Sequence, residues 1–286
     1  MRNSIKITVS AAATAALAFG LTACGTSSDP SSKPEGADAD TSKALVVAAS
    51  PVPHADILNY VRTHLAAKAG LKLQVKEFTD YVLPNRATQS GQVDANFFQH
   101  KPYLDDFNKK NHTTLVPVVS VHLEPLGLYS KKDKDLASVK PGQTVAVPND
   151  TTNEGRALKL LADNGLIKLR SGVGQDAQLS DIQDAKGLKF KELEAATLPR
   201  ALADVDAAVI NGNYALDAKL KPSRDALVLE KAAGNPYANL LVVKKGGEQD
   251  PRVQKLAKLL NSAQVKKYIE DKYQGAVIPA FGAVKS

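Results

Sequence analysis

The stretch VAVPNDTTNEGRALKLLADNGL, residues 145–166, decides the fold class of this 286-residue chain. An apolar, β-branched run stops at Pro148, small polar residues follow, and apolar residues at helical spacing then continue to Gly165. A strand that leads through a short polar turn into an amphipathic helix is the repeating unit of α/β folds. We predict that this helix begins at Asn153, because asparagine is a favoured N-cap residue.

Arg156 lies in the first turn of this predicted helix. A helix start already carries positive partial charge and unpaired N–H groups, so a cation is usually found at the other end. An ordinary cap followed by a solvated arginine is the commoner arrangement. The alternative is that the helix start and Arg156 share one negative ligand group, since a guanidinium matches a carboxylate bidentately. A carboxylate is favoured over a phosphate because no glycine-rich loop with a lysine is present.

Strand and helix patterns continue to alternate along the rest of the chain. This alternation predicts an α/β fold with mostly parallel sheets. Two α/β units fit the length, and residues 117–132 and 229–245 are candidates for two crossings between them. We therefore predict one lobe at residues 44–125 and 231–286 and a second lobe at residues 126–230. A cleft between two lobes is a preferred place for a small-molecule ligand.

The N-terminus has the features of an export signal. Residues 1–23 contain a short basic start and the 14-residue apolar stretch ITVSAAATAALAFG, which is too short to span a bilayer. The following LTAC resembles a bacterial lipobox, which implies cleavage before Cys24 and lipid attachment to its thiol and new amino group. Residues 24–43 are rich in Ser, Gly, Pro and Asp and predict a flexible tether. We expect a lipid-anchored protein on the extracytoplasmic face of the cell membrane.

Composition argues against several other classes of protein. The net charge of +7 is spread along the chain, without a basic stripe interleaved with aromatic residues, so nucleic-acid binding has little support. Cys24 is the only cysteine, and the five histidines have no recognisable metal-ligand spacing. The chain contains no GxSxG sequence and no P-loop. We expect neither an enzyme nor a bound cofactor or metal.

Two further groups of residues are candidates for a binding site. Aromatic rings concentrate at Phe78, Tyr81, Phe97, Phe98, His100 and Tyr103. Such rings suit an apolar or thioether side chain, although each of them could also fill a core. The predicted strand AAVI is followed by Asn211, and strand ends in α/β sheets face the ligand crevice. A simple turn at Asn211 and Gly212 is the alternative.

Several segments together resemble the NlpA/MetQ family, the methionine-binding lipoproteins of ABC importers. These segments are SPVPHADIL (50–58), FTDYVLPNRATQSGQVDANFFQHKPYL (78–104), VHLEPLGLYS (121–130), VAVPNDTTNEGRALKLL (145–161) and VINGNYA (209–215). The resemblance covers about residues 44–281. It implies a type II periplasmic-binding-protein fold, in which two α/β lobes joined by two crossing segments close over one ligand.

The resemblance also implies roles for individual residues. Arg156 would pair with the carboxylate of an amino acid, with Asn153 beside it. Asn211, or Asn213 in its place, would hold the amino and carboxylate groups from the other side. The remaining candidates are Tyr81, Phe98 and His100 as walls of the side-chain pocket, Tyr103 nearby, and His54 at the mouth of the cleft.

The function implied is that of a solute receptor. It would bind L-methionine, or a relative such as D-methionine or a methionyl dipeptide, and deliver it to an ABC permease driven by a cytoplasmic ATPase. We expect a monomer. The alternatives are a receptor for another apolar amino acid or short peptide, a surface adhesin lipoprotein that has lost transport, and an enzyme that uses His100.

Overall fold

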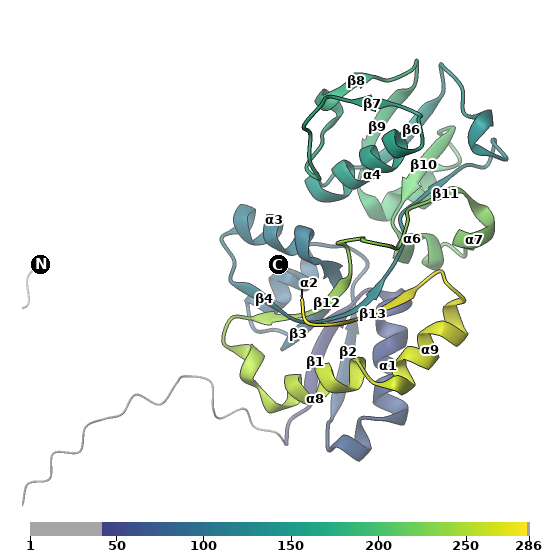
Figure 1. Cartoon of the computed structure of the whole chain (residues 1–286). Coiled ribbons are helices and arrows are strands. Elements are labelled where there is room, and N and C mark those ends of the chain that lie inside the picture. The colour runs from purple at the N-terminus through teal and green to yellow at the C-terminus, as the bar shows by residue number, and fades with distance from the viewer. Residues whose placement is uncertain (1–41, 285–286) are drawn as a thin grey trace, which may run out of the picture. The chain divides into compact units, whose positions relative to one another are not determined.

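The structure is a computed structural model that describes residues 42–284. The predicted signal peptide, Cys24 and nearly all of the predicted tether therefore lie outside the described residues. The described residues form two lobes, each built on its own β-sheet with helices packed against it (Figure 1). The predicted α/β class with two lobes is confirmed.

The first lobe contains a six-stranded sheet in the order β13-β4-β12-β3-β1-β2. Its strands are β1 (Leu45–Ala49), β2 (Leu73–Glu77), β3 (Ala95–His100), β4 (Leu115–Leu123), β12 (Asn239–Lys244) and β13 (Ile278–Gly282). Its helices are η1 (Pro51–Ala55), α1 (Asp56–His64), η2 (Ala67–Ala69), α2 (Leu83–Gln89), α3 (Lys101–Asn111), η6 (Gly247–Gln249), α8 (Pro251–Leu260) and α9 (Ala263–Tyr273). The apolar faces of α1, α8 and α9 bury Ile57, Leu256 and Ile269 in one core with residues of the sheet.

The second lobe contains a five-stranded sheet in the order β11-β5-β10-β6-β9 and a two-stranded sheet, β7-β8. Its strands are β5 (Gly127–Tyr129), β6 (Thr144–Pro148), β7 (Lys168–Leu169), β8 (Ile182–Asp184), β9 (Lys189–Leu193), β10 (Ala207–Ile210) and β11 (Ala226–Leu229). Its helices are η3 (Leu136–Ser138), α4 (Thr151–Asp163), η4 (Leu179–Asp181), η5 (Ala195–Thr197), α5 (Leu198–Ala201), α6 (Gly212–Asp217) and α7 (Pro222–Asp225). Separate apolar clusters on α4 and α5 cover β6 and β10 from two sides.

The prediction of mostly parallel sheets is wrong, because both main sheets are mixed. Strand β1 is parallel to β2 and β3, but β12 is antiparallel to both β3 and β4. In the second lobe β10 is parallel to β6 and antiparallel to β5. Parallel neighbours need a crossover connection, usually a helix, whereas a strand that arrives from the other lobe has no such constraint. The antiparallel strands β12 and β5 each directly follow a passage between lobes.

The chain passes between the two main sheets twice in the described residues. The first passage, residues 124–126, joins β4 to β5, and the second, residues 230–238, joins β11 to β12. Both passages lie within segments predicted as crossings, while the limits of the two lobes stay a prediction. The two connections join strand ends of one sheet to strand ends of the other, and the candidate site is built from residues at such strand ends.

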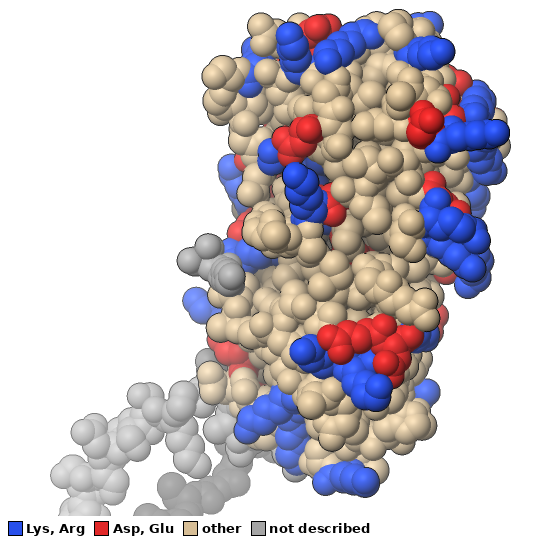
Figure 2. Space-filling model, turned by 45° about the vertical axis from the view of Figure 1, so that its right-hand side comes forward, with Lys and Arg blue, Asp and Glu red and all other residues tan. Residues whose placement is uncertain are grey.

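The outer surface carries both signs of charge. Figure 2 shows lysine and arginine side chains interspersed with aspartate and glutamate over the face in view. Several of these charges form surface ion pairs one helical turn apart, such as Lys101 with Asp105 and Lys267 with Asp271. Among the described helices, none combines the length and the apolar character needed to cross a membrane.

Candidate functional site

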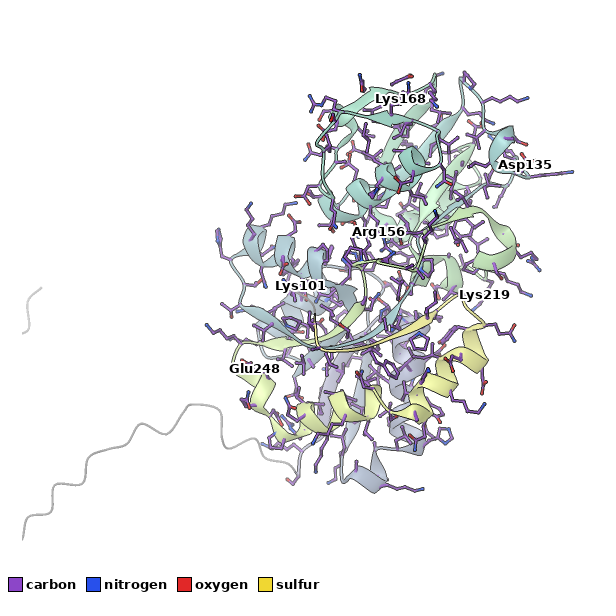
Figure 3. The ribbon with its side chains drawn as sticks, viewed as in Figure 1. Lys101, Asp135, Arg156, Lys168, Lys219 and Glu248 are labelled. Atoms are coloured by element: carbon purple, nitrogen blue, oxygen red, sulfur yellow. The ribbon has the colours of Figure 1, made fainter. Side chains whose placement is uncertain are left out.

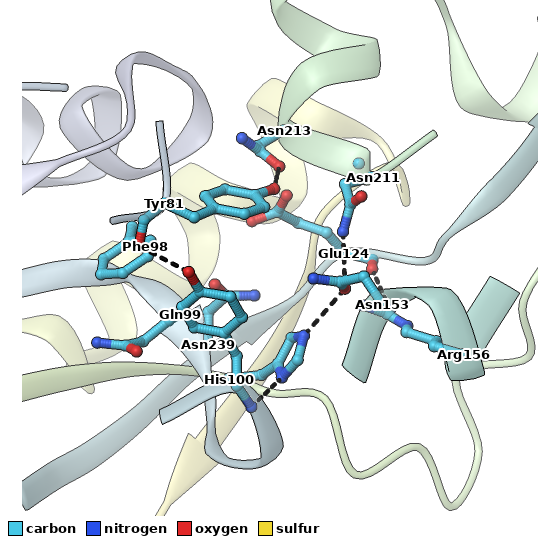
Figure 4. A pocket seen from close by; sticks show the side chains of 12 residues that line it. Tyr81, Phe98, Gln99, His100, Glu124, Asn153, Arg156, Asn211, Asn213 and Asn239 are labelled. Atoms are coloured by element: carbon cyan, nitrogen blue, oxygen red, sulfur yellow. Dashed lines mark hydrogen bonds between the residues drawn. The ribbon is translucent and has the colours of Figure 1, made fainter. Parts of the chain in front are cut away.

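A pocket lies where the two lobes meet, beside the first passage of the chain (Figure 4). Its empty volume is about 340 Å³. Its lining residues come from both lobes: Tyr81, Phe98, Gln99, His100, Tyr103, Glu124, Asn153, Arg156, Asn211, Gly212, Asn213 and Asn239. The structure thus brings together Tyr81, Phe98, His100, Tyr103, Asn153, Arg156, Asn211 and Asn213, but not His54, Phe78 or Phe97.

Helix α4 presents its first turns to this pocket. Its N-cap is Asp150, whose carboxylate accepts hydrogen bonds from the backbone N–H of Asn153 at 3.0 Å and from Asn153 Nδ2 at 2.9 Å. The prediction that Asn153 is the N-cap is therefore wrong: the helix begins at Thr151 and Arg156 lies in its second turn. The start of this helix is already satisfied by a carboxylate of the chain itself.

Asn153 connects the two lobes through its side-chain oxygen. Oδ1 accepts from Asn211 Nδ2 at 2.9 Å and lies 3.2 Å from His100 Nε2. His100 Nδ1 accepts the backbone N–H of Tyr103 at 3.2 Å, so the proton of the neutral ring is on Nε2, which donates to Asn153. Burial, followed by the charge of Arg156, lowers the pKa of His100 to about 3, so the ring is neutral at physiological pH.

Arg156 is buried where the lobes meet (Figure 3). Its Nε and Nη2 donate to the carboxylate of Glu230 at 3.0 and 2.6 Å, and Nη2 also donates to the backbone oxygen of Glu124 at 2.9 Å. The guanidinium lies 4.2 Å from the centre of the Tyr237 ring. The expectation that Arg156 and the helix start share one ligand charge is corrected, because each already has its own carboxylate. Arg156 Nη1 has no partner among the described residues.

Asn211 and Asn213, which follow β10, differ in whether their side-chain oxygen already has a hydrogen-bond partner. Asn213 Oδ1 accepts the hydroxyl of Tyr81 at 2.5 Å. Asn211 Oδ1 is buried and has no hydrogen-bond partner among the described residues. Because buried polar atoms are nearly always paired, this oxygen is a candidate acceptor for a ligand. The contacts therefore favour Asn211 over Asn213.

Aromatic rings form one wall of the pocket. The Tyr81 ring lies 5.8 Å from Phe98 and 5.7 Å from Tyr103, between ring centres, and the Tyr103 hydroxyl donates to the Tyr81 backbone oxygen at 2.9 Å. Phe97 points to the opposite face of β3 and is buried in the core of the first lobe, as strand alternation requires. Phe78 packs against a separate apolar cluster.

Glu124 brings a carboxylate into the pocket that sequence reasoning missed. The residue is buried, and its Oε1 lies 2.6 Å from His122 Nε2 and 3.3 Å from His54 Nε2. Burial raises the pKa of this carboxyl group, while His54, Arg156 and the backbone N–H of Asn213 oppose the rise. His54 itself is buried behind Glu124 and does not line the pocket, so its predicted place at the mouth of the cleft is wrong.

The group formed by His54, His122 and Glu124 is also close enough to hold a metal ion. The candidate ligand atoms of these three residues lie within 4.8 Å of one another. Spacing in the sequence gave no sign of this cluster, because His54 comes from η1 and the other two residues from β4 and its end. The hydrogen bond between His122 and the Glu124 carboxylate, and the one between His54 and the Asn239 amide oxygen, account for the short distances.

Strand pairing brings in two other residues that the sequence did not reveal. Asn239 begins β12 and is paired with His100 of β3 and His122 of β4, so its side chain reaches the pocket through sheet register. Gln99 precedes His100 on β3 and belongs to a buried amide network with Asn85 and Asn96. A signal for Glu124 was present, since it is the one acidic residue in the apolar run VHLEPLGLY.

The pocket therefore offers acceptors and donors to the same ligand. The Glu124 carboxylate and Asn211 Oδ1 are acceptors suited to an ammonium group. Arg156 Nη1 is a donor suited to a carboxylate. The aromatic wall of Tyr81, Phe98 and Tyr103 suits an apolar or thioether side chain. Together these groups match a small zwitterion with such a side chain.

The chain is similar to several known proteins. The methionine-binding lipoprotein MetQ of Bacillus subtilis (strain 168) is 42% identical over 242 residues, which cover 83% of this chain and 88% of that protein. The D-methionine-binding lipoprotein MetQ of Salmonella typhimurium is 42% identical over 214 residues, which cover 74% and 79%. The solved structure of a nutrient binding protein from Burkholderia cenocepacia bound to methionine is 44% identical, with a TM-score of 0.80, and covers 83% of this chain and 100% of that one.

These likenesses confirm the predicted substrate-binding-protein fold. The family model described as NlpA lipoprotein matches residues 45–281, which is most of the sequence. The chain belongs to the NlpA lipoprotein family.

Proposed function

We propose that this protein is the extracytoplasmic receptor of an ABC importer and that its ligand is L-methionine or a close relative. The observation that carries the proposal is the combination, in one pocket, of the buried Glu124 carboxylate, the buried Arg156 guanidinium and an aromatic wall. The names of the relatives and the methionine bound to one of them support the same ligand class. The proposal includes no catalytic step.

The ammonium group of the ligand would lie against the first passage, from β4 to β5. Glu124 supplies a buried carboxylate there, and Asn211 Oδ1 supplies an acceptor that has no partner among the described residues. A charge-assisted hydrogen bond is roughly twice as strong as a neutral one. These two acceptors therefore select a ligand with a free amino group.

The ligand carboxylate would bind Arg156 through Nη1. The other guanidinium nitrogens are fixed by Glu230 and by the Glu124 backbone oxygen, so the donor is already oriented before the ligand enters. A group that is held in place beforehand loses less conformational entropy on binding. Asn153 supports this arrangement from the same helix by its bonds to His100 and Asn211.

The thioether side chain would lie against Tyr81, Phe98 and Tyr103. Each sulfur–aromatic contact contributes about 0.3–1.5 kcal/mol. The wall belongs to the first lobe, whereas Arg156 and Asn211 belong to the second, so a ligand held by both sets of residues contacts both lobes. Contacts from both lobes favour the closed form over the open form by their differential affinity.

Delivery to the membrane depends on parts outside the described residues. We propose that lipid attached to Cys24 anchors a monomer to the membrane and that residues 24–43 let it reach the permease, which a cytoplasmic ATPase drives. Membership of a lipoprotein family supports this anchor. A tether of this composition behaves as a flexible chain.

The ligand can be identified by mass spectrometry of the small molecules released when freshly purified protein is denatured. We expect methionine in close to one-to-one amount, with chiral chromatography showing the L form. Release of another apolar amino acid or of a methionyl dipeptide would show that methionine is not the ligand, but it would still support a receptor function. Protein that releases nothing, and gives no heat with L-methionine in calorimetry, would contradict the proposal.

A further inference from the structure

Two buried histidines lie directly behind the ligand pocket without lining it. His54 comes from η1 and His122 from β4, and both rings face the Glu124 carboxylate. We propose that His54 and His122 are positioning residues that hold Glu124 oriented and ionised for the ammonium group of the ligand. This inference rests on the proposed function, because it names the support of the same site.

The hydrogen bonds fix which ring nitrogen carries the proton. His122 Nε2 lies 2.6 Å from Glu124 Oε1, and His54 Nε2 lies 2.9 Å from Asn239 Oδ1 and 3.3 Å from Glu124 Oε1. A carboxylate and an amide oxygen only accept, so both Nε2 atoms donate. Both Nδ1 atoms are buried without a partner among the described residues, which suits a bare acceptor better than an N–H.

Packing holds both rings in these orientations. The rings of His54 and His122 lie 4.8 Å apart, and Phe97 meets them edge-on at 4.8 and 5.2 Å. His122 and Glu124 are two residues apart, so an extended chain places both on one side of the sheet. The donors are therefore as rigid as the core of the lobe that surrounds them.

His54 also determines what Asn239 offers to the pocket. Since Asn239 Oδ1 accepts from His54 at 2.9 Å, the amide presents its Nδ2 group as a donor on its other side. One buried ring thus orients a carboxylate acceptor and an amide donor. Figure 4 shows Glu124 and Asn239 among the side chains that line the pocket.

Neutral histidines are suited to this role because they orient the carboxylate without cancelling its charge. Burial lowers the pKa of His54 to about 4 and that of His122 to about 3, so neither ring is an imidazolium at physiological pH. A lysine or arginine in the same place would form an ion pair and remove the negative charge that attracts an ammonium group. Within residues 42–284, the arginine whose charge acts on Glu124 is Arg156, and it is already paired with Glu230.

The pH dependence of binding follows from this support. Among the described residues, the titratable groups coupled electrostatically to Glu124 are His54, Arg156, Tyr81 and, more weakly, Tyr273, and His122 is hydrogen-bonded to it. Only the ionised carboxylate attracts an ammonium group, so affinity falls as the pH drops through the pKa of Glu124. A hydrogen bond to the ionised form lowers that pKa, so losing the donor from His122 raises it. The fall in affinity then begins at a higher pH.

The test compares two variants of His122. In His122→Phe the ring remains but the donor is lost, and we expect the pH at which L-methionine affinity falls to rise by about one unit. In His122→Gln the amide nitrogen can replace Nε2, and the profile should return toward that of the unchanged protein. His64→Phe, on the exposed side of α1, is the matched control and should leave the profile unchanged.

A second measurement does not depend on the ligand. Carbon-13 NMR of the Glu124 carboxyl in the ligand-free protein should show its pKa raised in His122→Phe and restored in His122→Gln. A pH profile in His122→Phe that differs only by a constant factor, with an unchanged Glu124 pKa, would overturn the inference. If methionine fails to bind the unchanged protein while the NMR shift appears, the proposed ligand is wrong and the positioning of Glu124 stands.

Discussion

At the scale of single residues, the site is built from side chains that are paired before any ligand arrives. Arg156 donates to Glu230 and to the backbone of Glu124 and lies against the Tyr237 ring. Its place in α4 causes no electrostatic conflict, because Asp150 satisfies the helix start and Glu230 balances the guanidinium. What remains open is one nitrogen of Arg156 and one oxygen of Asn211, which limits where a zwitterion can bind.

The role of Arg156 can be tested without leaving a buried charge unpaired. Arg156→Ala alone would strand the Glu230 carboxylate, and breaking one side of a buried ion pair costs about 3–5 kcal/mol. The double variant Arg156→Gln with Glu230→Gln removes both charges and keeps polar side chains of similar length. We expect its stability to remain close to that of the unchanged protein and its L-methionine affinity, measured by calorimetry, to fall at least tenfold, about 1.4 kcal/mol.

Arg252 provides the matched control for this variant. It donates to Asp250 and to Asp94 and also reaches the backbone oxygen of Ala44, far from the pocket. Arg252→Gln with Asp250→Asn should therefore leave methionine affinity unchanged. A folded Arg156 and Glu230 double variant that binds as tightly as this control would show that the carboxylate is held elsewhere.

At the scale of elements, α4 is fixed against the segment that follows β7. A methyl group added at Gly155 would lie 2.1 Å from the backbone oxygen of Gln175 and 2.8 Å from the backbone nitrogen of Ala177. The loop backbone thus packs directly on the helix at this position. Only a residue without a side chain fits there, one position before Arg156.

Replacement of Gly155 by alanine should destabilise the protein, although the same replacement usually stabilises a helix. In an exposed helix interior, glycine to alanine stabilises by up to about 1 kcal/mol. Here we expect Gly155→Ala to destabilise by about 1–3 kcal/mol, because backbone atoms must move to admit the methyl group. Thermal unfolding should show a fall of several degrees, and methionine affinity should fall as Arg156 shifts. Gly174→Ala, where nothing lies within 4 Å, is the control and should change neither quantity.

Local sequence patterns were enough to predict the alternation of strands and helices. The N-cap of α4 and some of the pocket residues were not predicted, because they depend on contacts between segments that are distant in the sequence. The N-cap of α4 was misplaced by three residues, at Asn153 instead of Asp150, because PNDTTNEG contains several residues that can cap a helix, and only tertiary context selects Asp150. The resemblance led to seven of the pocket residues, but not to Glu124 or Asn239. The place of Asn239 depends on the register of β12 with β3 and β4, which no single segment encodes. Glu124 reaches the pocket because β4 ends at Leu123, where the chain passes to the second lobe.

At the scale of the whole described molecule, hydrogen bonds across the pocket hold the two lobes together. Tyr81 donates to Asn213 at 2.5 Å, and the Tyr214 hydroxyl donates to the backbone oxygen of Thr79 at 3.1 Å. The rings of Tyr81 and Tyr214 lie 5.0 Å apart, so both bonds belong to one aromatic contact between α6 and the segment before α2. This contact lies at the rim of the ligand wall and is lost if the lobes separate.

Removal of one rim bond should therefore shift the balance between closed and open forms. Tyr214→Phe keeps the ring and loses a hydrogen bond worth about 1 kcal/mol, which we expect to lower L-methionine affinity about fivefold. Small-angle X-ray scattering of the ligand-free variant should give a larger radius of gyration, and saturating methionine should restore the compact value. Tyr273→Phe loses a hydroxyl bonded to Asp56 within one lobe, so it should lower stability without changing either affinity or radius. If both variants behave alike, the rim bond does not contribute to closure, and the ligand alone supplies the difference in free energy between the two forms.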